Sequence, residues 1–389
     1  MTSRTDVAIV GGGIMGSAVA YWLTAFDPGL DVTVIERDPS YSQASSALSA
    51  SSIRQQFSIP ANIRVSQASF SFLQDVGDQL RVGNERPEIG LVERGYLYLG
   101  TRAHEPSMRD VNAVQRAEGA DVALLDAEAL GARFPWLALE DVALASLGLS
   151  GEGWFDGYAL LTAFARKARA QRARWVTADA VGLTLTQGAI SGVSLADGTT
   201  IGCDAVVNAA GPWASHVAHW ADVDLPVKAR RRTVFVIACK ATFPGMPLVI
   251  DQSGFWIRPE GQHYIAGTAS PSDADDAPLE PEYELFESAL WPALARRIPA
   301  FAEAKLLRAW AGYYEINVFD HNAIIGPHRT TKNLFFINGF SGHGLQQAPI
   351  AARGLAEMIL GRSPSLDLSD FRFERLVEGR PLLERNVIG

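Results

Sequence analysis

Hydrophobic positions divide the first 36 residues into a strand, a helix and a second strand. Apolar runs occur at 7–10 and 32–35. Between them, apolar side chains recur at helical spacing on one face, at Ile14, Ala18, Trp22 and Ala25. Proline and glycine in Asp27-Pro28-Gly29 end this helix. The pattern predicts one βαβ unit.

Two later segments repeat the junction of a strand with glycine. The first is Val206 to Trp213, a short apolar strand that turns sharply at Gly211-Pro212 before a helix. The second is the strand 334–338, followed by three glycines and a helix over about 347–360. Because the three junctions are far apart, they predict one discontinuous domain.

The segment 228–268 alternates apolar and polar residues as antiparallel strands do. Segment 271–276 is acidic and is expected to form an exposed loop. We predict an α/β plus antiparallel-β protein with two domains. A Rossmann-like domain is expected from 1–83, 150–215 and 320–389, and a discontinuous antiparallel-sheet substrate domain from 84–149 and 216–319.

The composition narrows the class of protein. A length of 389 residues favours two domains, and 48% hydrophobic with 20% charged residues is typical of a folded globular chain. The net charge of −9 argues against a nucleic-acid partner. No apolar run of about 18 residues and no leader pattern occur, so we expect a soluble, cytoplasmic protein without a membrane partner. Cys203 and Cys239 are expected to be buried and reduced, and no metal site is predicted.

The turn Gly11-Gly12-Gly13-Ile14-Met15-Gly16 has the glycine spacing of a dinucleotide-binding loop. The first glycine permits the tight turn, the second lets the backbone approach a pyrophosphate, and the third lets helix and strand pack closely. Glu36 follows Gly16 by 20 residues at the end of the second strand, where an acid binds ribose. FAD and NAD share this fingerprint, so the turn does not distinguish between them. Glu36 disfavours only a ribose with a 2′-phosphate, because the two negative charges would repel each other.

Taken together, three motifs resemble the D-amino-acid oxidase superfamily, on its sarcosine and glycine oxidase branch. They are 11–16, Asn208-Ala209-Ala210-Gly211-Pro212-Trp213 and Gly339-Phe340-Ser341-Gly342-His343-Gly344. The C-terminal third, from Gly312 to Pro349, resembles in particular the FAD-dependent oxidoreductase domain-containing proteins. The similarity covers nearly the whole chain and implies an FAD-binding domain of the glutathione reductase type.

The resemblance also implies which residues contact FAD. They are Gly11, Gly13, Ile14, Met15, Gly16, Glu36, Arg37, Ser45, Ser46, Ala47, Val181, Gly211, Trp213, Gly339, Gly342, His343, Gly344, Leu345 and Gln346. The turn from Gly339 to Gln346 is expected to approach the flavin ring, where the N-terminus of the following helix would stabilise the negative charge that reduction places on the flavin. The alternative is a turn that only caps the backbone.

Members of this branch often attach FAD covalently through a histidine or a cysteine. The loop 41–57 holds no histidine, Leu48 standing about where one is expected, and 308–320 holds no cysteine. We predict non-covalent FAD. The segment 41–59, rich in serine and alanine, is otherwise typical of a plain surface linker.

The resemblance implies that Arg54 binds a substrate carboxylate, since a guanidinium fork matches that group. The alternative is an ordinary surface arginine. Gln346 stands where sarcosine oxidases carry a second carboxylate-binding lysine, and the strand 264–267 lacks their oxygen-assisting lysine. Oxidase activity is therefore open. His343 is a candidate to supply positive charge beside the flavin or merely to hydrogen-bond the turn.

Aromatic residues are candidates for the substrate pocket, with core packing as the alternative for at least half of them. They are Trp256, Tyr264, Tyr313 and Tyr314. Arg54, His343 and Tyr264 are the candidate catalytic residues. The basic run 228–232 is typical of a solvated face and could instead steer an anionic substrate.

The expected reaction is hydride removal from the carbon beside a neutral amine to flavin N5, followed by hydrolysis of the imine. Sarcosine or another N-substituted glycine, and a small amino dicarboxylate such as iminodiacetate, are the first substrate hypotheses, with O2 marginally favoured as acceptor. Three alternatives stay open: an FAD-dependent dehydrogenase with another acceptor, an NAD-dependent dehydrogenase, and a flavoprotein with mainly an assembly or binding role.

Overall fold

The predicted βαβ unit lies at the centre of the first sheet. In the computed structural model, which describes residues 4–331 and 333–385, β1 (Arg4–Val10) lies between β2 (Val32–Glu36) and β12 (Thr200–Asn208) and is parallel to both. The other strands of this sheet are β9 (Arg174–Thr177), β10 (Ala180–Thr186), β11 (Ala189–Leu195), β18 (Ile324–Pro327) and β19 (Leu334–Asn338). Strands β19, β12, β1, β2 and β9 run parallel in that order, which is a Rossmann-like arrangement.

Both faces of this sheet are buried, as its nearly continuous apolar strands require. Val7 and Ile9 share a core with the helices α1 (Ile14–Phe26), α6 (Gly157–Ala170) and α9 (Gly344–Ile359). Ala8 and Val10 face the other core, under α7 (Ala214–His219). Helix α9 begins at Gly344, three residues before the predicted start, so the last glycine of the C-terminal motif already belongs to the helix.

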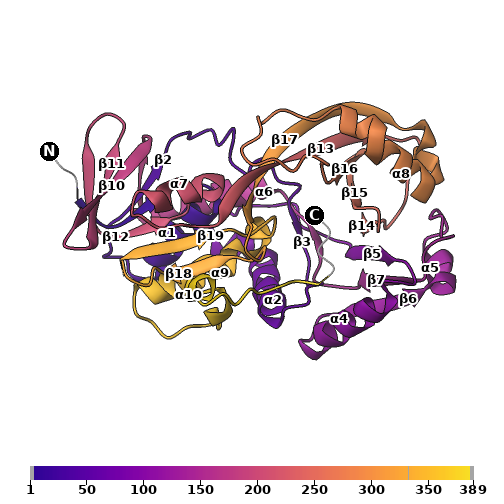
Figure 1. Ribbon diagram of the computed structural model, residues 1–389, viewed down its shortest axis with the longest axis horizontal. Helices are drawn as coiled ribbons and strands as arrows, with labels where there is room; N and C mark the ends of the chain where they lie inside the picture. The colour runs from indigo at the N-terminus through magenta and orange to yellow at the C-terminus, as the bar shows by residue number, and fades with distance from the viewer. Residues whose placement is uncertain (1–3, 332, 386–389) are drawn as a thin grey trace.

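A second sheet of eight strands lies at the other end of the molecule (Figure 1). It contains, in spatial order, β17 (Lys305–Asn317), β13 (Val227–Ala238), β16 (His263–Thr268), β15 (Phe255–Glu260), β14 (Leu248–Ile250), β5 (Tyr96–Gly100), β7 (Leu144–Gly148) and β6 (Val122–Asp126). All neighbours are antiparallel except β14 and β5. The helices α5 (Ala127–Arg133) and α8 (Trp291–Arg297) pack against it in a separate core.

The segments of the two sheets alternate along the chain. Every strand of the second sheet falls within 84–149 or 216–319, and every strand of the first falls outside these ranges. A small sheet of β3 (Ser52–Ile53), β8 (Gly153–Trp154) and β4 (Val92–Glu93) connects segments across this division. The division into two domains with these boundaries stays a prediction.

The remaining helical segments include one helix of 15 residues that packs in the core of the first sheet. They are α2 (Pro60–Gln74), α3 (Val76–Gln79), α4 (Glu105–Ala117), α10 (Glu374–Val377), η1 (Gly211–Trp213), η2 (Phe286–Leu290), η3 (Pro299–Glu303) and η4 (Ser369–Phe371). Among residues 4–331 and 333–385, none of the helices combines the length and apolar character needed to cross a membrane.

Two expectations are wrong. The serine-rich segment 41–59 is not a plain surface linker, because Ser46, Arg54 and Phe57 are buried in it and Ser52 and Ile53 form β3. Cys203 is buried as expected, but Cys239 is partly exposed at the end of β13. Both thiols are free.

Candidate functional site

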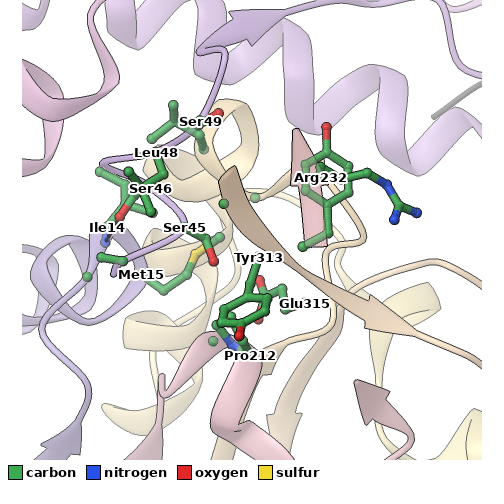
Figure 2. A pocket seen from close by; sticks show the side chains of 18 of the residues that line it. Ile14, Met15, Ser45, Ser46, Leu48, Ser49, Pro212, Arg232, Tyr313 and Glu315 are labelled. Carbon is green, nitrogen blue, oxygen red and sulfur yellow. Dashed lines mark hydrogen bonds between the residues drawn. The ribbon is translucent and has the colours of Figure 1, made fainter. Parts of the chain in front are cut away.

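A cavity of about 400 Å3 is lined by residues from both sheets. On one side lie the turn after β1, the end of β2 and the turn after β12; on the other lie β13, β15 and β17. Figure 2 shows Ser46 beside Ile14 in this cavity, with Tyr313, Glu315 and Pro212 grouped on another part of its wall. The cavity has the size and mixed lining of a ligand pocket.

The glycines of the first turn are required by the backbone itself. Gly11 has φ 100°, and a Cβ there would overlap the carbonyl oxygen of Ala209. A Cβ at Gly16 would overlap the carbonyl oxygen of Gly11, and Gly16 lies outside the cavity lining. Its role is thus to let α1 pack against β1, while Gly11, Gly13, Ile14 and Met15 line the cavity.

The carboxylate of Glu36 lies beside this turn, and its role as a ribose-binding acid stays a prediction. Its Oε2 accepts a hydrogen bond from the Gly12 N–H at 2.7 Å, and Oε1 accepts from the Asp38 N–H at 2.8 Å. The next residue, Arg37, lies over the ring of Trp213 with 3.9 Å from Cζ to the ring centroid. Glu36, Arg37 and Trp213 line the same end of the cavity, together with Gly211 at φ 55°.

The serine-rich loop crosses the middle of the cavity. Ser46 Oγ accepts a hydrogen bond of 3.3 Å from the Ile14 N–H at the start of α1. Ser45 and Ser46 line the cavity, but Ala47 does not and packs against the core instead. The prediction that Val181 contacts FAD is also wrong: its side chain is 50% exposed, while residues 178–180 line the cavity.

The C-terminal glycine motif forms the turn from β19 into α9. Gly339 has φ 73° and Gly342 has φ 94°, values that favour glycine. A Cβ at Gly342 would overlap the ring of Tyr314, so this glycine lets the aromatic ring approach the turn. Gly342, Gly344, Leu345 and Gln346 line the cavity; Gly339 does not and serves the turn.

Arg54 is a buried cation at the wall of the cavity. It is 7% exposed, and its guanidinium donates to the Tyr98 hydroxyl and to His343 Nε2, the latter at 2.9 Å. Its Nε has no hydrogen-bond partner, and no described carboxylate forms an ion pair with it. The surface-arginine alternative is therefore wrong.

His343 is neutral in this arrangement. Because an arginine only donates, Nε2 must accept, and the ring proton belongs on Nδ1. Burial and the charge of Arg54 hold the pKa of His343 well below its usual value. The hypothesis that His343 supplies positive charge is therefore wrong, and Arg54 is the cation at this place.

Gln346 and Tyr314 lie next to Arg54. Gln346 Oε1 accepts a hydrogen bond of 2.9 Å from the backbone N–H of Arg54, which leaves its amide NH2 as a donor. Tyr314 lines the cavity, and burial raises the pKa of its hydroxyl while Arg232 and Arg54 oppose that effect. These side chains place several donors in one region of the cavity wall.

The aromatic candidates divide between the cavity and the core. Trp256, Tyr313 and Tyr314 line the cavity. Tyr264 does not: its hydroxyl donates to the Ala241 carbonyl at 3.0 Å and its ring packs against Phe301 in the second core. The prediction of Tyr264 as a catalytic or substrate-binding residue is therefore wrong.

The three arginines of the basic run on β13 are paired with acidic residues, two of them with the acidic loop 271–276, which is exposed as expected. Asp273 accepts from Arg230 at 2.5 Å and from Arg232 at 2.6 Å, and Arg231 pairs with Glu282 at 2.7 Å. Neither the solvated face nor the steering role describes these arginines, because their charges are paired. Arg232 also lines the cavity.

The sequence interpretation missed three groups around Arg54. Tyr98, on β5, accepts a hydrogen bond from the Arg54 guanidinium, and Tyr96, two residues earlier on the same strand, lines the cavity. Glu152 is fully buried and accepts from the backbone N–H groups of Gln55, at 2.6 Å, and Gln56, at 3.0 Å. The alternating tyrosines of Tyr96-Leu97-Tyr98 were the available signal for β5; Glu152 gave none.

Glu315 was also missed, although it lies in the segment from Gly312 to Pro349 that carries part of the resemblance. It lines the cavity, 9% exposed, and its Oε2 has no hydrogen-bond partner. Burial raises its pKa to about 7, although hydrogen bonds from the backbone N–H groups of Gly339 and Phe340 act to lower it. A buried, unpartnered carboxyl in a cavity indicates a place where a ligand hydroxyl or amine would bind.

Comparisons with known proteins agree on one family. The model of the family "FAD dependent oxidoreductase" (DAO) matches residues 6–358. FAD-dependent oxidoreductase domain-containing protein 1 of Xenopus laevis is 41% identical over 425 residues, which cover 99% of this chain and 85% of the relative.

Two solved structures have the same fold. L-proline dehydrogenase from P. horikoshii matches with a TM-score of 0.85 at 26% identity, over 98% of this chain and 100% of that one. Glycine oxidase from Geobacillus kaustophilus matches with a TM-score of 0.82 at 22% identity, over 95% and 98%.

Proposed function

Since the chain belongs to the family of FAD-dependent oxidoreductases, we propose that it oxidises the C–N bond of a small amino acid or secondary amine that carries a carboxylate. The observation that carries this proposal is Arg54, a buried guanidinium on the cavity wall with an unpartnered Nε and no paired carboxylate.

The residues of the cavity fit FAD. The turn 11–16 and the N-terminus of α1 would hold the pyrophosphate, and Glu36 the adenosine ribose. The turn 342–346 at the start of α9 would approach the flavin ring. Glu315 Oε2 and Arg54 Nε are buried polar atoms without partners in the same cavity, as expected where a polar ligand completes the hydrogen bonds.

A substrate carboxylate would compensate the charge of Arg54. Burying a cation without a counter-ion is costly, and its two hydrogen bonds to Tyr98 and His343 offset only part of that cost. The hydrogen bond to His343 also fixes the plane of the guanidinium. An anion that enters the cavity therefore meets a pre-oriented donor.

The protein groups bind and orient the substrate, while FAD when bound would supply the hydride acceptor for the carbon beside the nitrogen. Arg54 binds the carboxylate, and the free NH2 of Gln346 and the hydroxyl of Tyr314 add donors. The substrate amine reacts in its neutral form, so no strong side-chain base is required. Water then hydrolyses the imine product.

The proposed substrates are N-substituted glycines such as sarcosine and small amino dicarboxylates such as iminodiacetate. Glycine and L-proline belong in the same test, because they appear in the names of two proteins of the same fold.

We propose dioxygen as the electron acceptor because Arg54 places a fixed positive charge in the cavity. A dehydrogenase is the alternative, and one feature favours it. Ile265 and Ala266 on β16, where the resemblance to sarcosine oxidases leads one to expect a lysine, are apolar and buried.

We propose that FAD is bound without a covalent link. Leu48 stands about where the resemblance leads one to expect the attaching histidine, and the range 308–320, expected to carry the alternative cysteine, has none. Leu48 and Gly312 of that range are neighbours on the cavity wall, where a Cβ at Gly312 would lie 3.0 Å from the Leu48 Cβ. Neither residue carries a nucleophile.

An anaerobic screen tests the proposed function. The holoprotein is mixed with sarcosine, iminodiacetate, glycine, L-proline and the amides of the same compounds, and the flavin absorbance is followed. Bleaching by an acid but not by its amide supports the proposal. Bleaching by none of them would favour an assembly or binding role, and peroxide formation on admitting air separates an oxidase from a dehydrogenase.

A further inference from the structure

The C-terminal segment 382–385 binds the chain directly behind Arg54. Glu384 Oε2 accepts hydrogen bonds of 2.6 Å from both the N–H and the hydroxyl of Ser58. Its Oε1 accepts from Asn62 Nδ2 at 2.7 Å, and the Arg385 N–H donates to Ser58 Oγ at 2.8 Å. In Figure 1 the chain leads from α10 past α2 to this segment. Terminal segments are ordered in this way only when they are tied down.

The same contacts continue to the cavity wall. Asn62 Oδ1 accepts from Gln347 Nε2 at 3.0 Å, and the preceding residue, Gln346, accepts from the Arg54 N–H. Between Arg54 and Ser58, the N–H groups of Gln55 and Gln56 donate to Glu152. The segment 54–58 is thus held at its start by Gln346, in its middle by Glu152 and at its end by Glu384.

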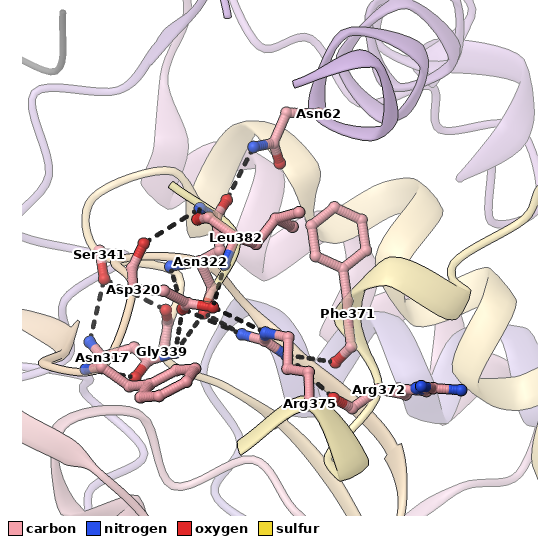
Figure 3. A network of polar contacts seen from close by, with 11 residues as sticks. Asn62, Asn317, Asp320, Asn322, Gly339, Ser341, Phe371, Arg372, Arg375 and Leu382 are labelled. Atoms are coloured by element: carbon pink, nitrogen blue, oxygen red, sulfur yellow. Dashed lines mark hydrogen bonds and ion pairs between the residues drawn. The ribbon is translucent and has the colours of Figure 1, made fainter. Parts of the chain in front are cut away.

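A buried ion pair fixes the C-terminal segment itself (Figure 3). Arg375 on α10 pairs with Asp320 at 2.8 Å, with side chains 5% and 0% exposed. Asp320 Oδ2 also accepts from the Leu382 N–H at 3.0 Å, and Asn322 Nδ2 donates to the Leu382 carbonyl at 2.6 Å. Glu384 is therefore presented to Ser58 from a fixed support.

The geometry points to Glu384 as a positioning residue for Arg54: by holding Ser58 and Asn62 it keeps the 54–58 segment, and so the guanidinium, in place to bind a substrate carboxylate. This inference rests on the proposed function for its ligand. Its physical reason is that binding by a single fork-shaped donor loses strength when the donor shifts by about 1 Å. Glu384 is also near enough to act on the charge of Arg54 electrostatically.

The test measures ligand binding and backbone protection separately in the holoprotein. Dissociation constants of 2-furoate and of its neutral analogue 2-furamide are obtained from the perturbation of the flavin spectrum. Hydrogen–deuterium exchange is followed at 55–58. Glu384→Ala should weaken furoate binding about tenfold, leave FAD content unchanged and speed exchange at Gln55 and Gln56 as well as at Ser58.

Two further variants keep the test decisive. Glu384→Gln keeps the size and one acceptor of the side chain. Its furoate affinity and its exchange rates at 55–58 should lie between those of wild type and Glu384→Ala, and they can be measured even if Glu384→Ala folds poorly. Leu383→Ala, at a neighbouring side chain that is 65% exposed, should behave as wild type.

Unchanged furoate binding in Glu384→Ala, or faster exchange confined to Ser58, would overturn the inference. Failure of the proposed function looks different. Wild type would then bind furoate no better than furamide, and exchange at Gln55 and Gln56 alone would decide whether Glu384 holds the segment.

Discussion

Arg54 and His343 lie 2.9 Å apart, with the guanidinium donating to Nε2 of a neutral imidazole inside a largely buried site. The pair joins the loop after β3 to the glycine turn before α9, two segments 289 positions apart in the chain. The imidazole orients the cation without neutralising it, so the positive charge remains to be satisfied by a ligand.

Replacing Arg54 tests the carboxylate site. Arg54→Ala should raise the apparent KM for a carboxylate substrate, or the Kd for 2-furoate, by about a hundredfold or more, since a hydrogen-bonded charge pair is lost. Arg54→Lys should recover only part of the affinity because it lacks the planar fork. Steady-state kinetics and titration of the flavin spectrum measure this. Exposed Arg94→Ala is the matched control, and an unchanged KM in Arg54→Ala would refute the carboxylate assignment.

The role of the glycine turn 11–16 in binding FAD can be tested by adding a single methyl group. Gly11→Ala should produce protein without FAD, because the Cβ would overlap the Ala209 carbonyl oxygen and φ is 100°. Gly182→Ala, on β10 of the same sheet, is the control, since a Cβ there meets only the Ser194 Cβ at 3.8 Å. The measurement is the ratio of flavin to protein absorbance after purification. A Gly11→Ala protein with a full complement of FAD would contradict the assignment of this turn.

Acid precipitation tests the type of cofactor attachment. Because Leu48 stands in place of the attaching histidine and 308–320 holds no cysteine, trichloroacetic acid should leave the yellow colour in the supernatant. Colour retained in the washed pellet would instead show a covalent link, and mass spectrometry of flavin-containing peptides would then identify the attached residue.

Glu315 should make the stability of the cofactor-free protein depend on pH. Its folded-state pKa is about 7, above the value of an unfolded glutamate, about 4.3, so the folded state binds the proton more tightly. Stability should therefore fall as pH rises between these values and level off above pH 7. The loss amounts to at most about 4 kcal/mol.

Glu315→Gln should remove this part of the pH dependence and be more stable than wild type at pH 8, but equally stable near pH 4. Urea unfolding at both pH values measures it, with the exposed Glu287→Gln as control. Parallel pH profiles of wild type and Glu315→Gln would show that Glu315 does not titrate in this range.

Local features of the fold and cofactor loop were predictable from sequence. The strand of β1, the helix of α1 and the carboxylate of Glu36 lie within 36 residues of one another, and their geometry follows from glycine conformation, helical periodicity and chain length. The same holds for the glycine turn before α9.

It was harder to predict which side chains of a strand face the cavity than to predict where the strand lies in the sequence. On β16, Tyr264 and Ile265 alternate between two buried faces, so a polar-apolar alternation that would identify the cavity side is missing. The prediction for Val181 is wrong for a related reason. Its neighbour Ala180 lines the cavity, and successive residues of β10 point to opposite faces of the sheet.

Partners contributed from distant segments could not be predicted at all. Tyr98, Glu152 and Glu384 lie near Arg54 because β5, β8 and the C-terminal segment are brought together by tertiary packing. The sequence shows that β13 carries a run of arginines. That they are paired depends on the path of the loop around Asp273, which the sequence does not show.

The hydrogen bond from Trp22 Nε1 to the Pro349 carbonyl, at 2.7 Å, spans 327 positions of the chain. It joins α1, which carries the first glycine turn, to α9, which carries the last. While the protein is being synthesised, the N-terminal helix emerges from the ribosome without the partner that completes its packing. The cavity is therefore complete only after α9 has been synthesised, and a translation product that ends before α9 would retain the dinucleotide motif but lack the site.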